Sequence, residues 1–167
     1  MSRPKMQVEF KNTRFVPFIK TNFQGDPERG GKFRSTARQA YIMIPDQELA
    51  LRMRADGFNI KETRPQDEED DFTPDYYVAV KLNFNKPYPE APAVHVILVT
   101  PDGARVELDE ESINLIDELF DSKSIRCVSL LCNMSFRNEG NNVLYIQEMT
   151  VEQSMENDPY RNYLRYN

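Results

Sequence analysis

The 167-residue chain contains no tryptophan, one histidine and two cysteines, and it has no long apolar run. Its longest apolar stretch, residues 93–99, is interrupted by His95, whereas a membrane-spanning helix needs about 20 apolar residues. The N-terminus shows no apolar segment of the secretory type. We therefore expect a cytoplasmic protein without membrane association, and the length favours a single domain.

Reactive residues are too few to favour an enzyme. A Ser-His-Asp or Cys-His site would have to use His95, and no nucleophile elbow, dinucleotide fingerprint or complete phosphate loop occurs. Cys127 and Cys132 lie in one predicted strand at an odd spacing, which points them to opposite faces. The acidic runs 67–71 and 109–111 lack the spacing of a calcium loop. We expect no disulfide, no metal, no cofactor and no catalytic residues.

Charge is unevenly distributed along the chain. The net charge is −6, yet residues 1–65 carry 13 bases and 7 acids whereas residues 66–167 carry 8 bases and 20 acids. A positive surface can therefore lie on an acidic body, and the local field matters more for binding than the total charge.

Period-2 hydrophobic patterns predict a mainly β protein. About seven short strands with two inserted helices are typical of a small antiparallel barrel, not of a doubly wound sheet. We expect strands over 14–23, 39–44, 76–84, 93–100, 104–108, 125–137 and 143–151, and residues 59–64 could form a further short strand. Helices are expected from Asp46 to the Asp56-Gly57 stop and over 112–120, with Asp109 as the cap of the second.

The strand over 76–84 has the clearest alternation. One face carries Tyr76, Val78, Val80, Leu82 and Phe84, which we expect in the core. The other face carries Tyr77, Ala79, Lys81 and Asn83, where either a ligand groove or a plain solvent face would fit.

Bases and aromatics interleave between residues 10 and 41. Single-stranded nucleic acid is bound by this combination, because bases stack on aromatic rings while Lys and Arg follow the phosphates. Phe33, between Lys32 and Arg34 in a glycine-rich stretch, is expected to be exposed. For Phe15 and Phe18, a place in the core and a place on the surface remain equally open.

Several short blocks occur in a fixed order: GGKFRSTARQAYIMI, ADGFNIKETRP, an acidic spacer, FTPDYYVAVKLNF, and PAVHVILVTPDGARVELDEESINLID. In this order the chain resembles phage-encoded single-stranded DNA-binding proteins of the OB-fold type over residues 15–151. The resemblance implies a small OB-like antiparallel barrel of about 5–7 strands. The residues that match the family's pattern are Lys32, Phe33, Tyr41, Asn59, Lys61, Arg64-Pro65, Tyr77, Val78, Val80, Lys81 and Phe84. Phe58 stands where the family often has tryptophan, and the C-terminus DPYRNYLRYN is not the usual acidic tail.

Together these patterns predict a non-catalytic, sequence-tolerant protein that binds single-stranded DNA and protects it during phage-type replication or recombination. The barrel is expected over residues 1–152, with a C-terminal tail over 153–167. The predicted DNA contacts are Lys20, Lys32, Phe33, Arg34, Arg38, Tyr41, Lys61, Tyr77 and Lys81. Further partners would be replication or recombination proteins, and exposed strand edges would permit a homodimer.

A second hypothesis rests on the acidic C-terminal part of the chain. Eight acids lie between Asp102 and Asp121. Such a surface could belong to an acidic protein-interaction module, or to a nucleic-acid mimic that inhibits a DNA-binding enzyme.

Overall fold

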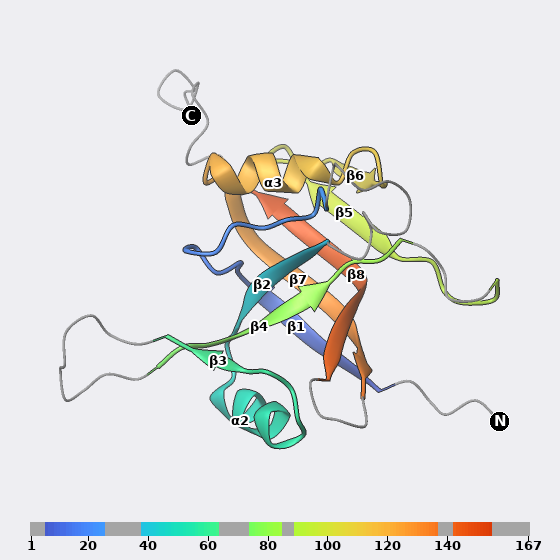
Figure 1. Cartoon of the computed structure of the whole chain (residues 1–167). Coiled ribbons are helices and arrows are strands. Elements are labelled where there is room, and N and C mark those ends of the chain that lie inside the picture. The colour runs from blue at the N-terminus through green and yellow to red at the C-terminus, as the bar shows by residue number, and fades with distance from the viewer. Residues whose placement is uncertain (1–5, 26–37, 64–73, 85–88, 137–141, 155–167) are drawn as a thin grey trace.

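The computed structural model describes residues 6–25, 38–63, 74–84, 89–136 and 142–154. Within these ranges the chain forms eight strands and two helices, so the mainly β class is confirmed (Figure 1). The strands are β1 (Gln7–Thr13), β2 (Gln39–Ile44), β3 (Lys61–Glu62), β4 (Tyr76–Lys81), β5 (His95–Val99), β6 (Arg105–Leu108), β7 (Ile125–Ser135) and β8 (Val143–Gln153), and the helices are α2 (Gln47–Ala55) and α3 (Asn114–Asp121).

The strands form one mixed sheet. Its main path is β1-β7-β8-β4-β2, with β3 paired to β4 and with β5 paired to both β8 and β6. The expectation of a wholly antiparallel sheet is wrong for two pairs, because β8 runs parallel to β4 and to β5. Parallel neighbours need a long crossover connection. The chain supplies one through α3 and β7 before β8 begins.

Residues 14–16 bring the two ends of this path together. The Val16 amide donates to the Tyr41 carbonyl at 2.9 Å, and the Met43 amide donates to the Arg14 carbonyl at 2.9 Å. The first strand therefore pairs with β7 along β1 and then touches β2, which gives the small OB-like arrangement expected from the sequence.

The predicted strand over 14–23 is wrong in its position. The continuous strand is β1, and the later segment meets β2 only at Phe15 and Asn22. Pro17 has no amide hydrogen to donate, and a turn follows it. Residues 17–20 therefore leave the sheet, and this excursion shapes the surface described below.

The two helices lie at opposite ends of the sheet (Figure 1). α2 begins as predicted, with the Asp46 carboxylate accepting the amide hydrogens of Glu48 and Leu49. The predicted cap of α3 is wrong. Asp109 accepts from the amides of Glu111 and Ser112 in the preceding turn, and Ile113 is the N-cap without a side-chain bond.

The core fills the space enclosed by the sheet and is sealed at its ends by the helices. Phe10, Phe23, Ile42, Leu82 and Met149 are almost completely buried. The inward side chains of β4 and the following residue are buried as predicted, whereas Phe84 is only partly buried. The hairpin between β5 and β6 turns at Gly103, whose φ of +89° favours glycine.

Candidate nucleic-acid interface

Six side chains gather on the outward side of the sheet, over β2, β3, β4 and β8. Alternation along β4 turns Tyr77 and Lys81 outward, because Tyr76, Val78, Val80 and Leu82, which alternate with them, are buried in the core. The register in which β2, β3 and β8 pair with β4 then determines which side chains lie beside these two residues. We call this surface the aromatic–basic face, and it consists of Phe18, Tyr41, Lys61, Tyr77, Lys81 and Tyr145.

Tyr77 stands at the centre of the aromatic group. Its ring centroid lies 6.0 Å from that of Tyr41 and 5.7 Å from that of Phe18, both in edge-to-face contact. Tyr41 lies opposite Ala79, whose small side chain leaves room for the diagonal contact between the two tyrosines. Edge-to-face contact is a favoured arrangement of aromatic pairs. The group stays partly open to solvent, because Tyr41 and Tyr77 are half-buried and Phe18 is exposed.

Phe18 reaches this face from outside the sheet. The turn after Pro17 lifts it away from β2, and it remains 62% exposed while Phe15 is 5% exposed. The structure thus places Phe15 in the core and Phe18 on the surface, a choice that the sequence left open. A large exposed aromatic ring next to half-buried tyrosines contributes little to the core, which is why it points to a binding role.

Two lysines bring positive charge to the aromatic rings. The Lys61 ammonium lies 5.1 Å from the centroid of Tyr41, within cation–π distance. Lys81 is in register with Gln39 on β2 and with Tyr145 on β8. The structure therefore brings together Tyr41, Lys61, Tyr77 and Lys81 among the predicted contacts.

Phe18 and Tyr145 were not among the predicted contacts. Tyr145 could have been found from the alternation of Leu144 and Ile146, which point inward and turn the residue between them outward. Its place beside Lys81 depends on a parallel pairing between distant strands, which no local pattern indicates.

Arg38 is not part of this surface. It is 2% exposed, its guanidinium donates to the Phe23 carbonyl, and it lies 5.6 Å from the centroid of the Phe84 ring. As the structure places it, Arg38 is thus engaged inside the protein and exposes almost no surface for the predicted phosphate contact. A strand-end arginine can be buried when it finds a carbonyl acceptor and an aromatic face, and sequence alone gives no sign of either.

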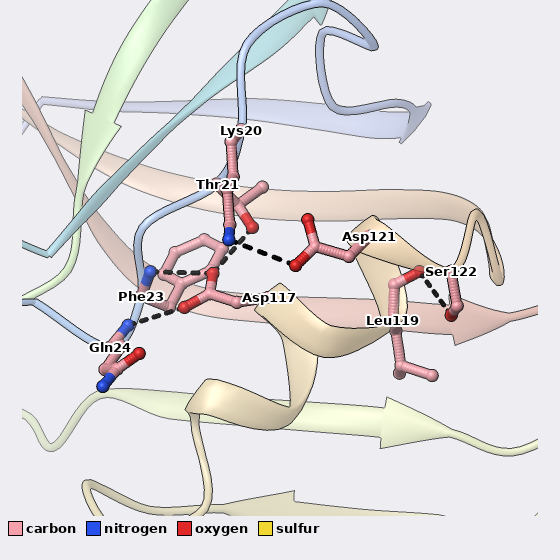
Figure 2. A network of polar contacts seen from close by, with 8 residues as sticks. All are labelled: Lys20, Thr21, Phe23, Gln24, Asp117, Leu119, Asp121 and Ser122. Carbon is pink, nitrogen blue, oxygen red and sulfur yellow. Dashed lines mark hydrogen bonds and ion pairs between the residues drawn. The ribbon is translucent and has the colours of Figure 1, made fainter.

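Asp117 of α3 fixes the same stretch of chain from the other side (Figure 2). Its carboxylate accepts from the Thr21 hydroxyl at 2.6 Å, the Phe23 amide at 2.9 Å and the Gln24 amide at 2.8 Å. The backbone of Phe23 is thus held on both sides, because its amide donates to Asp117 and its carbonyl accepts from Arg38. These two buried charged residues set the course of the chain immediately before residue 26 and at residue 38.

The remaining predicted contacts are Lys20 and three residues of the segment 26–37. Lys20 forms an exposed ion pair with Asp121, 3.1 Å apart, at the end of α3 (Figure 2). Lys32, Phe33 and Arg34 lie outside the described residues.

The groups that an enzyme would use show no convergent arrangement in the described ranges. Burial and the Glu152 carboxylate raise the pKa of Cys127 to about 11, and burial raises the pKa of Cys132 to about 12. His95 lies on the surface, 2.8 Å from Glu107 on β6. No cluster of three or more potential metal ligands is found within the described parts of the chain.

One comparison with known proteins gives a match. Residues 3–158 match the protein family described as "Putative phage ssDNA-binding domain". The chain belongs to this family. No curated protein and no solved structure matches the chain. None of the helices in the described ranges is long and apolar enough to cross a membrane.

Proposed function

We propose that the aromatic–basic face binds single-stranded DNA and that binding is sequence-tolerant. The observation that carries this proposal is the cluster of Phe18, Tyr41 and Tyr77, three neighbouring aromatic rings on the outer side of the barrel. In OB folds the face made by the second and third barrel strands binds oligonucleotides. Here β2 and β4 correspond to those strands, because they follow β1 along the chain and only the two-residue β3, which lies off the main path of the sheet, comes between them.

Aromatic rings would bind the bases of the strand, and lysines would bind its phosphates. Bases stack on Tyr41, Tyr77 and Phe18, while the ammonium groups of Lys61 and Lys81 neutralise neighbouring phosphates. Any base has a flat face, so this mode of binding does not select a sequence. Lys32, Phe33 and Arg34 are proposed as further contacts, because the chain on both sides of residues 26–37 is fixed by Asp117 and Arg38.

In the cell, such a protein would coat exposed strands without catalysing a reaction. Family membership supports a phage origin, and strand protection during replication or recombination in the host cytoplasm is the role we propose. Replication or recombination proteins would be its partners, and a homodimer would pair exposed strand edges.

The central experiment measures the affinity of the full chain for a fluorescent oligothymidine at several salt concentrations. Logarithmic plots of the association constant against salt should have a slope of about −0.7 for each phosphate neutralised. The double variant Tyr41→Ala/Tyr77→Ala should lose about 2 to 6 kcal/mol of binding free energy, since each stacked base contributes about 1 to 3 kcal/mol. Leu51→Ala, at an exposed apolar residue of α2, serves as the control.

Two results would overturn the proposal. One is the absence of binding at low salt. The other is an unchanged affinity in the double variant, provided that its thermal midpoint shows an intact fold. The first result would favour the acidic module, which should instead be captured by basic proteins and ignore oligonucleotides. The second would show that strand binding does not use the aromatic–basic face.

A further inference from the structure

The barrel has a gap where its first strand changes partners. β1 pairs with β7 as far as Thr13 opposite Val128, and the chain then turns to β2 at Arg14. The first residues of β7, Ile125 to Cys127, therefore extend beyond their last partner in β1. Two cavities open along this gap.

Arg14 and Arg126 line both cavities. The smaller cavity, about 350 Å³, lies toward Met43 and Tyr76, and the larger, about 550 Å³, lies toward Phe120 and Lys123 at the end of α3. Both volumes are in the range of small-molecule sites. Each cavity therefore combines apolar walls with two guanidinium groups at the boundary between them.

Local charge in the larger cavity favours an anion. Its lining includes three cationic residues, Arg14, Lys123 and Arg126, and one acidic residue, Asp121. The Asp121 carboxylate forms an ion pair with Lys20, which offsets its charge. A protein of net charge −6 thus has a local positive site on this side of the barrel.

Backbone strain occurs at the same two places. Among the described residues other than glycine, only Asn12 and Lys123 have a positive φ, of 51° and 56°. Asn12 lines the smaller cavity and Lys123 the larger. Glycine would adopt this φ after a helix at lower cost, so Lys123 carries a conformational penalty of the kind that is common at functional sites.

We propose that these two cavities form a single arginine groove, which binds additional phosphates and bases of the single-stranded DNA that crosses the aromatic–basic face. This inference rests on the proposed function and extends the DNA-binding surface from the aromatic–basic face into the groove. Apolar walls at Pro17, Phe120 and Ile125 offer contact surface for bases. Arg14 and Arg126 are suited to both parts of the strand, because a guanidinium forms bidentate hydrogen bonds with phosphate and stacks on bases.

The groove adjoins the aromatic–basic face at two points. Pro17 lines the larger cavity and is the chain neighbour of Phe18. Met43 lines the smaller cavity and is the register partner of Tyr77. A strand leaving the aromatic rings therefore reaches Arg14 and Arg126 without crossing the core.

The test compares two oligothymidines, of about 6 and about 16 nucleotides, which span the usual site sizes of OB folds. The full-length variant Arg14→Gln/Arg126→Gln is measured against Arg52→Gln/Arg105→Gln, which removes the same charge from exposed residues of α2 and β6. We expect the groove variant to bind the long oligomer about tenfold more weakly. Its salt slope should be less negative by about 1.4, and its affinity for the short oligomer should stay within about twofold.

Equal behaviour of the groove variant and the control on the long oligomer would overturn the groove while leaving the proposed function intact. An equal loss on both oligomers would also overturn it, because the arginines would then act on the aromatic–basic face itself. Failure of the unaltered protein to bind either oligomer would instead refute the proposed function. Thermal midpoints of all variants check the fold, and Arg14→Lys/Arg126→Lys, which should restore the salt slope but not the full affinity, provides a second variant that retains the charge.

Discussion

The aromatic–basic face and the acidic end of the molecule, formed by β6, α3 and the turns beside them, differ in how their side chains are used. Eight acids and one base lie between Asp102 and Asp121. Much of this acidity serves local structure: Asp102 accepts from Thr100, Asp109 accepts from Ser112, and Asp117 holds residues 21–24. The exposed ring of Phe18 and the half-buried ring of Tyr77, by contrast, cap no helix and hold no turn through a hydrogen bond.

This difference teaches how the net charge should be interpreted. Caps and buried hydrogen bonds account for several carboxylates of the acidic end, so their number alone does not indicate a ligand. Exposed aromatic rings have no comparable structural use. The contrast therefore favours the strand-binding hypothesis over the nucleic-acid mimic, and the following variants test it.

The largest effect is expected at Asp117, the acidic-end residue on which the other region depends. Asp117→Ala removes the acceptor of one hydroxyl and two amide hydrogens in a buried site. We expect the free energy of unfolding to fall by about 3 kcal/mol, since buried donors left without acceptors are costly. Urea denaturation measures it. The control Glu118→Ala, at an exposed residue of the same helix, should change stability by less than about 0.5 kcal/mol.

Asp117 and Arg38 also show where sequence reasoning reaches its limit. Alternation correctly predicted which side chains of β4 face inward and that Tyr77 and Lys81 face outward. Alternation can be predicted locally, because successive side chains of any pleated strand point to opposite faces. The burial of Arg38 depends on a carbonyl 15 residues away, and that of Asp117 on a loop more than 90 residues away. No local pattern carries such information.

Register limits the prediction of the site in the same way. Tyr41 and Lys61 join Tyr77 only because β2 and β3 pair with β4 in one particular alignment. Phe18 joins them because a proline turn departs from a strand pattern that looked continuous. The types of residue at the site could be predicted, whereas their neighbours could not.

The next effect concerns Phe18, which distinguishes binding from folding on the aromatic–basic face. Phe18→Ala should weaken oligothymidine binding by about 1 to 2 kcal/mol through lost stacking. Its effect on the unfolding free energy should be below about 0.5 kcal/mol, because the ring is mostly exposed. Fluorescence anisotropy and urea denaturation measure the two quantities. A loss of stability as large as the loss of affinity would show that the ring supports the fold, contrary to our interpretation.

A smaller effect is expected from single lysines. Lys61→Gln and Lys81→Gln should each make the salt slope of binding less negative by about 0.7, one phosphate contact apiece. Arg105→Gln removes the same charge from β6 on the acidic side. If all three variants shift the slope equally, binding responds only to net charge, and the distinction between the two regions fails.

The smallest effect concerns pH and belongs to the acidic end. Hydrogen bonds from Ser112 and from the backbone amides of Glu111 and Ser112 lower the pKa of Asp109 below its ordinary value of 3.8. A carboxyl whose pKa is lower in the folded than in the unfolded chain stabilises the fold above the unfolded pKa, and this contribution is lost as pH falls through the folded pKa. Asp109→Asn should therefore flatten the fall in unfolding free energy between about pH 5 and about pH 2. Glu110→Gln is the charge-matched control, and equal flattening in both variants would mean that general charge repulsion, not the turn at Asp109, sets the acid stability of this end.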